Sequence, residues 1–316
     1  MYTCVGSIFN LIFSGIFGII YIEKRGKDMM DMSTLEQLSA KDQNNYKSYL
    51  DRMSQSVATS SKHLIPFYTI GAKTVLDVGC ADGTLMKAIQ SINPEARVIG
   101  IDLNQNAVDI AIAAGLEVYH TPLEQIYSLG IVFDCIIFSS VLHEISSYAN
   151  TNRFSALPIS DALVYANYLL ADNGSIIIRD GLMTSHTGYC TMKFANPKDE
   201  KWFKKFIVEY KYPFFSYDYH KMYDGITCDE DLAQEFLATW TWGENSWHRE
   251  MNEKFCILTE ERWMKVVKGA GFDTIAFFKS KEDYPKYLAP KVKLYSKNGE
   301  EFFPYMTCTI IAKKVS

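Results

Sequence analysis

Apolar and polar positions alternate along the chain in a way that separates short buried strands from amphipathic helices. Several short segments have apolar residues at consecutive positions, as strands covered on both faces require. The five runs are 74–78, 97–102, 116–120, 133–140 and 175–180. The helical stretches between them are 83–92, 104–114 and 160–170, which end at Asn-Pro, Gly and Asn-Gly. Strands alternating with helices predict an α/β fold with a doubly wound, mostly parallel sheet.

The pattern changes after Asp180. Residues 181–258 are rich in aromatic side chains and lack a dependable rhythm of strands and helices, so we interpret them as an α-type cap inserted after the fifth strand. Regular structure returns with a helix over 260–270 and strands over 273–279 and 307–314. These last strands bring the predicted Rossmann-like sheet to seven.

Five segments follow from these patterns. The stretch Ser33-Thr34-Leu35-Glu36 has the form of a capping box and predicts the start of a helix before the core. The segments are an apolar leader at 1–30, an N-terminal helical extension at 31–62, the Rossmann-like core at 63–180, the cap at 181–258, and a last helix with strands that complete the sheet at 259–316.

The leader has two interpretations. Residues 5–22 form an uncharged run of 18 residues, followed by the basic cluster at 23–27. Such a run is long enough for a membrane anchor, and its basic flank would keep the rest of the chain on the cytoplasmic side. Alternatively, the methionines at 29–32 mark the true start, and the leader does not belong to the native protein.

Composition narrows the class of partner and the compartment. The formal net charge is −5, although residues 263–316 carry 10 Lys and Arg against 5 Asp and Glu. A protein that follows the phosphates of a nucleic acid usually has a stronger positive surface. The seven cysteines are scattered without any C-x-x-C spacing. This indicates neither a disulfide framework nor a zinc site, and it fits a cytoplasmic protein.

The stretch VLDVGCADGTL at 75–85 carries the clearest functional signal. Asp77 ends a buried strand, and Gly79 and Gly83 bracket a turn into a helix whose free N–H groups can face a ligand. Asp102 ends the next strand 25 residues after Asp77, where a carboxylate can accept both hydroxyls of a ribose. The prediction depends on this pairing, because a glycine turn alone is most often structural.

These residues resemble the class I S-adenosylmethionine-dependent methyltransferases, whose first motif is an acid followed by a glycine-rich turn. The resemblance covers about residues 63–180 and resumes at 260–316. It implies S-adenosyl-L-methionine as cofactor, with contacts from Asp77, Gly79, Cys80, Ala81, Gly83, Asp102, Leu103, Thr121, Pro122, Leu123, Ser139 and Ser140. Two positions depart from the family pattern. Ala81 replaces the middle glycine, and His120-Thr121-Pro122-Leu123 stands where many members place an acid that contacts the adenine.

Two alternatives remain beside methyl transfer. An NAD(P)-dependent Rossmann oxidoreductase shares the fold and a similar turn, but its fingerprint begins with glycine directly after the strand, whereas Asp77 leads the turn here. A non-catalytic sensor or subunit that binds S-adenosylmethionine is the other alternative, and Ala81 favours it slightly. Binding of NAD would indicate the first, and cofactor binding without methyl transfer the second.

Methyl transfer from a sulfonium is an in-line displacement, so the protein has to align the acceptor, exclude water and accept a proton where the acceptor loses one. The ends of the fourth and fifth strands and the cap are placed for this work. The catalytic candidates are His143, Glu144, Asp180 and His248. Each has a structural alternative, as a helix cap, as an ion pair or as part of the core of the cap.

The acceptor is expected to be a small molecule methylated at oxygen or nitrogen, because the cap is acidic and aromatic. Trp240, Trp242 and Trp247 could stack against it, although aromatic side chains of this kind more often form the core of such a cap. The basic stretch 263–316 keeps a nucleic-acid or peptide acceptor open. No metal site is expected, since His143-Glu144 is not followed by the second histidine of an H-E-x-x-H motif.

Overall fold

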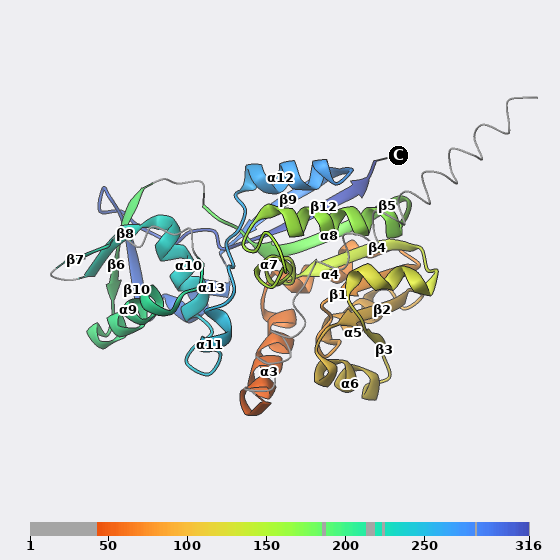
Figure 1. The fold of residues 1–316 in the computed structure, drawn as a ribbon, viewed down its shortest axis with the longest axis horizontal. Helices are drawn as coiled ribbons and strands as arrows, with labels where there is room; N and C mark the ends of the chain where they lie inside the picture. The colour runs from red at the N-terminus through yellow and green to blue at the C-terminus, as the bar shows by residue number, and fades with distance from the viewer. Residues whose placement is uncertain (1–42, 185–187, 213–218, 223–224, 282, 316) are drawn as a thin grey trace, which may run out of the picture.

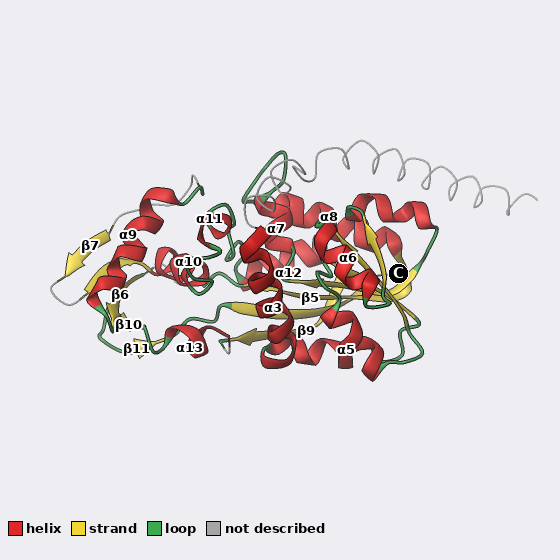
Figure 2. Ribbon diagram, turned by 90° about the horizontal axis from the view of Figure 1, so that it is seen from below, coloured by secondary structure: helices red, strands yellow, loops and turns green. Residues whose placement is uncertain are grey.

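The computed structural model describes residues 43–184, 188–212, 219–222, 225–281 and 283–315. Two sheets lie side by side in it, the larger on the right and the smaller on the left of Figures 1 and 2. The apolar leader and the helix start expected at Ser33 lie outside the described residues. Within the described ranges, no helix is both long enough and apolar enough to cross a membrane.

The larger sheet is the predicted core, with strand order β3-β2-β1-β4-β5-β12-β9. Its strands are β1 (Thr74–Val78), β2 (Arg97–Asp102), β3 (Glu117–His120), β4 (Phe133–Ser139), β5 (Leu170–Gly181), β9 (Phe272–Ser280) and β12 (Thr307–Lys314). The first five strands run parallel, and β12 pairs antiparallel with both β5 and β9. The doubly wound, mostly parallel sheet of seven strands is thereby confirmed.

Helices cover both faces of this sheet. Because successive residues of a strand point to opposite sides, the strands pack against the helices of both faces. Leu76 of β1 belongs to the apolar cluster that contains residues of α8 (Ala156–Leu169) and α12 (Glu260–Gly269). Its neighbour Val75 belongs to the cluster that contains residues of α5 (Thr84–Ile92) and α6 (Gln105–Ala113). The continuous apolar runs in the sequence are therefore explained by burial on both faces.

The smaller sheet lies in the cap and has five antiparallel strands in the order β11-β10-β6-β8-β7. Its strands are β6 (Tyr189–Phe194), β7 (Tyr219–Met222), β8 (Gly225–Asp229), β10 (Val292–Ser296) and β11 (Glu301–Phe302). The accompanying helices are α9 (Glu200–Glu209), α10 (Glu230–Trp240), α11 (Trp247–Glu250) and α13 (Asp283–Leu288). The cap expected as α-type therefore has its helices and, in addition, strands that pair across long sequence separations.

Aromatic rings pack between this second sheet and its helices. The ring of Phe236 in α10 stacks on Trp240 at 5.4 Å between centroids and meets Phe203 of α9 edge-on at 5.1 Å. Trp240 and Trp247 are 4% and 3% exposed. These rings form the core of the cap, which was the structural alternative to a stacking role.

Helix α3 (Gln43–Thr59) lies between the two sheets in both views (Figures 1 and 2). Arg52 donates a hydrogen bond to the carbonyl of Thr241 in the cap at 2.6 Å. Ser54, on the same helix, donates to the carboxylate of Asp82 in the glycine turn. The helix therefore connects the cap with the core.

Candidate active site

The glycine turn lies at the carboxyl ends of β1 and β2. The N–H groups of Gly79 and Cys80 donate to the carbonyl of Ile101 at 2.8 and 3.0 Å, which fastens the turn to β2. Gly79 and Gly83 have φ angles of 72° and 76°, and a Cβ at Gly79 would lie 2.7 Å from a methyl group of Val141. A Cβ at Gly83 would clash with Leu116 Cδ1, so the turn needs glycine at both positions for its backbone conformation and for space.

Asp102 holds the middle of this turn. Its two carboxylate oxygens accept hydrogen bonds from the N–H groups of Ala81 at 2.9 Å and Asn104 at 2.8 Å. Ala81, which replaces the middle glycine of the family motif, has a φ of 48° in the left-handed region. The alanine therefore keeps the backbone conformation of a glycine turn, and the hydrogen bond to Asp102 helps to offset the strain.

Asp77 is almost completely buried at the end of β1. The residue is 1% exposed, and its Oδ2 has no hydrogen-bond partner in the described part of the structure. Burial raises the pKa of this carboxyl to about 7, although the positive charge of Lys62 opposes the shift. A buried carboxylate oxygen with an unused lone pair is suited to a cationic group of a ligand.

Asp77→Asn is expected to remove a pH dependence of cofactor binding. A carboxyl with a pKa of about 7 becomes charged between about pH 6 and pH 8, so wild-type affinity for a cationic ligand should rise over this range. The effect of pH on the stability of the free protein has the opposite sign to its effect on affinity. Because the pKa in the folded state exceeds the ordinary 3.8, the free wild-type protein loses stability as the pH rises toward 7, and Asn avoids this loss.

Calorimetric titration with S-adenosylmethionine and thermal unfolding, each at about pH 6, 7 and 8, measure both effects of Asp77→Asn. Asp172→Asn, at an exposed position of β5, is the matched control and should behave like the wild type. A wild-type affinity that does not change with pH would contradict the assignment of Asp77 to a cationic group.

The other residues expected to contact the cofactor follow the carboxyl ends of β1 to β4. Ser140 has a φ of 61° and accepts a hydrogen bond from Arg179 Nη1 at 2.7 Å. The hydroxyl of Ser139 is buried without a partner among the described residues. Half-buried positions are Leu103, Thr121 and Pro122, and buried positions within apolar clusters are Cys80 and Leu123.

His143 is held at the start of α7 (Leu142–Ser147) by Asp180 at the end of β5. Asp180 Oδ1 accepts a hydrogen bond from His143 Nδ1 at 2.7 Å, and Oδ2 accepts from the N–H groups of Leu142 at 2.8 Å and His143 at 3.2 Å. Burial lowers the pKa of the imidazole, but the charge and hydrogen bond of Asp180, with nearby Glu144 and Glu253, raise it to about 9. Two of the catalytic candidates thus form one fixed unit.

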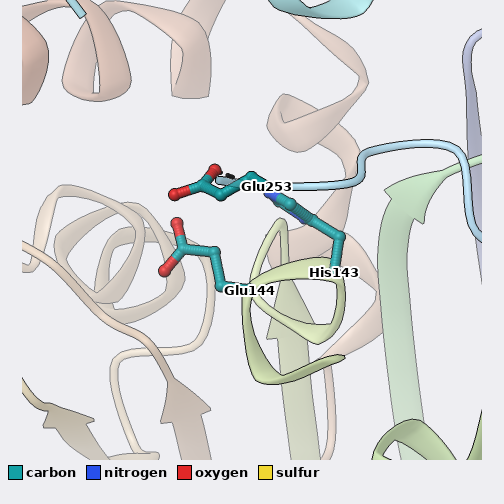
Figure 3. A group of neighbouring side chains, drawn as sticks. All are labelled: His143, Glu144 and Glu253. Atoms are coloured by element: carbon teal, nitrogen blue, oxygen red, sulfur yellow. Dashed lines mark ion pairs between the residues drawn. The ribbon is translucent and has the colours of Figure 1, made fainter. Parts of the chain in front are cut away.

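A buried acidic cluster lies next to His143. Figure 3 shows the carboxylates of Glu144 and Glu253 turned toward one another. Arg249 Nη2 is 3.5 Å from Glu144 Oε1, and Arg249 Nε is 3.3 Å from Glu253 Oε1. Burial and the charge of Glu253 raise the pKa of Glu144 to about 7, against the opposing charges of Arg249 and His143. Glu250, 1% exposed, also lies in this region.

A pocket lies against this cluster and joins the three parts of the molecule. Helix α3 contributes Tyr49 and Arg52, the carboxyl edge of the core sheet contributes Ser140, and the cap contributes Trp242 and Tyr287. The pocket is also lined by His143, Glu144, Asp180, Glu250 and Glu253. The rings of Tyr49 and Trp242 lie 5.4 Å apart between centroids. The pocket therefore extends from the expected cofactor edge to the acidic cluster.

A sequence model of the methyltransferase domain matches residues 39–276, which are 238 of the 316 residues. The sheet order and the acid-led glycine turn described above agree with this match. The chain belongs to the class I S-adenosylmethionine-dependent methyltransferase family. The match decides between methyl transfer and the hydride transfer that the sequence left open.

Solved methyltransferase structures are similar to this chain at low sequence identity, and the first two below share its fold. The 1,6-didemethyltoxoflavin-N1-methyltransferase of Burkholderia thailandensis is 13% identical, with a TM-score of 0.50 and 90% of each chain covered. The mitomycin 7-O-methyltransferase MmcR is 12% identical, with a TM-score of 0.50, and the match covers 88% of this chain and 60% of that one. Human N-acetylserotonin methyltransferase is 13% identical, with a TM-score of 0.47, and the match covers 85% of this chain and 55% of that one.

The chain thus spans less than two thirds of the length of the mitomycin and human enzymes. No match was found among curated proteins.

The fourth catalytic candidate, His248, is exposed on α11 and is not among the residues that line the pocket. Trp242 does line the pocket, whereas Trp240 and Trp247 pack inside the cap. The structure therefore brings His143, Glu144 and Asp180 together and leaves His248 outside.

Sequence reasoning does not single out Tyr49, Arg52 or Glu253, although all three line the pocket. A weak signal exists for each. Tyr49 and Arg52 are three residues apart and so share one face of a helix, and Glu253 follows Arg249 at the spacing of an i, i+4 ion pair.

Proposed function

We propose that the protein transfers the methyl group of S-adenosylmethionine to an oxygen or nitrogen atom of a small-molecule acceptor bound in the pocket. The observation that carries this proposal is the position of His143. It is fixed by Asp180 and lines the pocket together with Ser140, which follows β4 on the edge that bears the glycine turn. An acceptor in the pocket would lie between the cofactor edge and the cap.

The residues at the sheet edge fit this cofactor. Each carboxylate oxygen of Asp102 accepts one backbone N–H and retains capacity for a ribose hydroxyl. The unpartnered Oδ2 of Asp77 suits the ammonium group of the methionine part. When bound, S-adenosylmethionine supplies an electrophilic methyl group on a cationic sulfur, so no covalent nucleophile is required of the protein.

The part of the protein in this reaction is to position the acceptor and to exclude water. The rings of Tyr49 and Trp242 line the pocket, each with a guanidinium over one face, and the surface they leave to the pocket can contact an acceptor ring. The unit of His143 and Asp180 orients the acceptor atom, and the carboxylates of the acidic cluster can accept its proton. The toxoflavin and mitomycin enzymes, named for small-molecule acceptors, have the same fold.

The proposal extends to organisation and compartment. We assign the core to residues 63–180 and 259–316, except for 283–302, and the acceptor-binding cap to 181–258, which α13, β10 and β11 from 283–302 complete. We place the enzyme in the cytoplasm, because the six described cysteines are all buried free thiols. Attachment to a membrane would require that residues 5–22 serve as an anchor.

His143→Ala tests the proposed function. With tritiated-methyl S-adenosylmethionine and the small-molecule fraction of a cell extract, we expect methyl transfer to fall roughly 100-fold, because the acceptor loses its orienting partner. Calorimetry should show unchanged affinity for the cofactor. His220→Ala, at an exposed position of β7, is the matched control and should transfer at the wild-type rate. Undiminished transfer by His143→Ala, or label found in protein or nucleic acid alone, would refute the proposal.

A further inference from the structure

Three side chains with metal-ligating atoms converge beside the pocket, although they come from two distant segments. His143 and Glu144 lie in α7, and Glu253 follows α11. A ring nitrogen of His143 and one oxygen from each glutamate all lie within 4.8 Å of one another. Figure 3 shows the imidazole beside the two facing carboxylates. The sequence predicted no metal site here, because 110 residues separate Glu253 from His143 and leave no local motif.

The distances leave room for an ion. His143 Nε2 and Glu253 Oε2 are 3.8 Å apart, which is too long for a hydrogen bond. Zinc lies about 2.0–2.2 Å from an imidazole nitrogen or a carboxylate oxygen, so an ion fits between these two atoms. The other oxygen, Glu253 Oε1, accepts a hydrogen bond from the hydroxyl of Tyr148 at 2.8 Å. This second bond holds the carboxylate with Oε2 toward His143.

Asp180 prepares His143 as a ligand. Because Nδ1 of the imidazole donates to Asp180 Oδ1 at 2.7 Å, the nitrogen on the side of the glutamates is Nε2. A carboxylate behind a metal-binding histidine is a recurrent arrangement in proteins, because it fixes the tautomer and the ring orientation. His143 therefore has the supporting contact that a metal ligand requires.

Glu250 points to a cation independently of these three residues. It is 1% exposed, it lines the same pocket, and its Oε1 has no hydrogen-bond partner among the described residues. Three carboxylates, those of Glu144, Glu250 and Glu253, gather here around the guanidinium of Arg249, whereas Asp180 already pairs with His143. A buried excess of carboxylates is costly unless positive charge compensates it, and a divalent cation would do so.

We infer that His143, Glu144 and Glu253 bind a divalent transition-metal ion. One imidazole nitrogen and two carboxylate oxygens suit an ion such as Zn²⁺ or Mn²⁺. Three protein ligands leave a coordination position open, and these ligands line the pocket. The ion site itself does not depend on the proposed function. Occupation of the open position by an acceptor atom does rest on the proposed function.

Calorimetric titration of the chelator-treated, full-length protein with ZnCl₂ and with MnCl₂ tests this inference, and we expect one ion per chain. Glu253→Gln keeps the shape of the side chain and an oxygen for Tyr148. Loss of a carboxylate that only supports a metal ligand weakens metal binding by about 10- to 100-fold. Glu253 is proposed as a ligand itself, so this substitution should weaken metal binding by more than that. Glu144→Gln should have a similar effect. Glu261→Gln, exposed on α12, is the matched control and should leave binding unchanged.

Thermal unfolding of each variant confirms that it is folded. A wild-type protein that binds no ion, or a protein that binds it equally well after both substitutions at positions 144 and 253, would overturn the inference. The titration does not require methyl transfer. A protein that binds the ion but transfers no methyl group would therefore contradict the proposed function alone, and an active protein that binds none would contradict the ion site alone.

Discussion

Asp102→Ala is expected to weaken binding of S-adenosylmethionine by roughly 10²- to 10⁴-fold. The carboxylate offers two hydrogen bonds to the ribose, and hydrogen bonds to a charged group contribute about 1.5–3 kcal/mol each. The same carboxylate accepts the N–H groups of Ala81 and Asn104, so the alanine also loosens the turn. Isothermal titration with S-adenosylmethionine and with its demethylated product measures the loss.

Two further substitutions serve as comparisons for Asp102→Ala. Asp102→Asn keeps one carbonyl oxygen at the position and should bind with intermediate affinity. Asp109→Ala removes an exposed acid from α6 in the same region and should bind like the wild type. If Asp102→Ala were folded and bound the cofactor normally, the ribose would lie elsewhere, and the assignment of the cofactor edge would lose its main support.

Glu235→Ala is expected to have a comparably large effect on stability. Glu235 is fully buried in α10, and its carboxylate accepts hydrogen bonds from the hydroxyl of Tyr210 at 2.9 Å and from the N–H groups of Phe255 at 2.7 Å and Cys256 at 3.0 Å. Alanine removes the acceptor of the two buried backbone N–H groups, which costs about 1–3 kcal/mol each. The free energy of unfolding, measured in urea, should fall by roughly 2–6 kcal/mol.

The effect of Glu235→Ala should extend to the active site, because the segment that Glu235 fastens also carries Glu253. Hydrogen exchange at the amides of Phe255 and Cys256 should accelerate. Glu235→Gln keeps one acceptor oxygen and should cost less stability, and Glu244→Ala, exposed on the cap, should cost none. Wild-type stability in Glu235→Ala would mean that these hydrogen bonds do not hold the segment.

The core strands are predictable from the sequence because each is a local apolar run. β1, β2 and β12 have the expected bounds, whereas β5 begins at Leu170, five residues before the run at 175–180. A polar turn with Asn173 at a φ of 61° lies within β5. From the sequence, this turn indicates only the end of the preceding helix. The second sheet could not be predicted in this way, since Val292 of β10 pairs with Phe194 of β6, far away in the chain.

The same distinction separates the two halves of the active site. Asp77 and Asp102 end neighbouring strands, so their proximity follows from local patterns. Tyr49 and Glu253 reach the pocket from α3 and from the cap, and tertiary packing alone brings them together. His248 shows the limit of composition as a guide, because one short helix turns its neighbour Arg249 toward the acidic cluster and leaves His248 at the surface.

The order of strands in the two sheets has a consequence for biosynthesis. In the smaller sheet β10 lies between β6 and β11, and in the larger sheet β12 lies between β5 and β9. On the ribosome, neither sheet can be completed before residues 292–314 have left the exit tunnel. Until then the nascent chain carries open strand edges that can pair with other chains. This architecture leaves those edges open until translation is nearly complete.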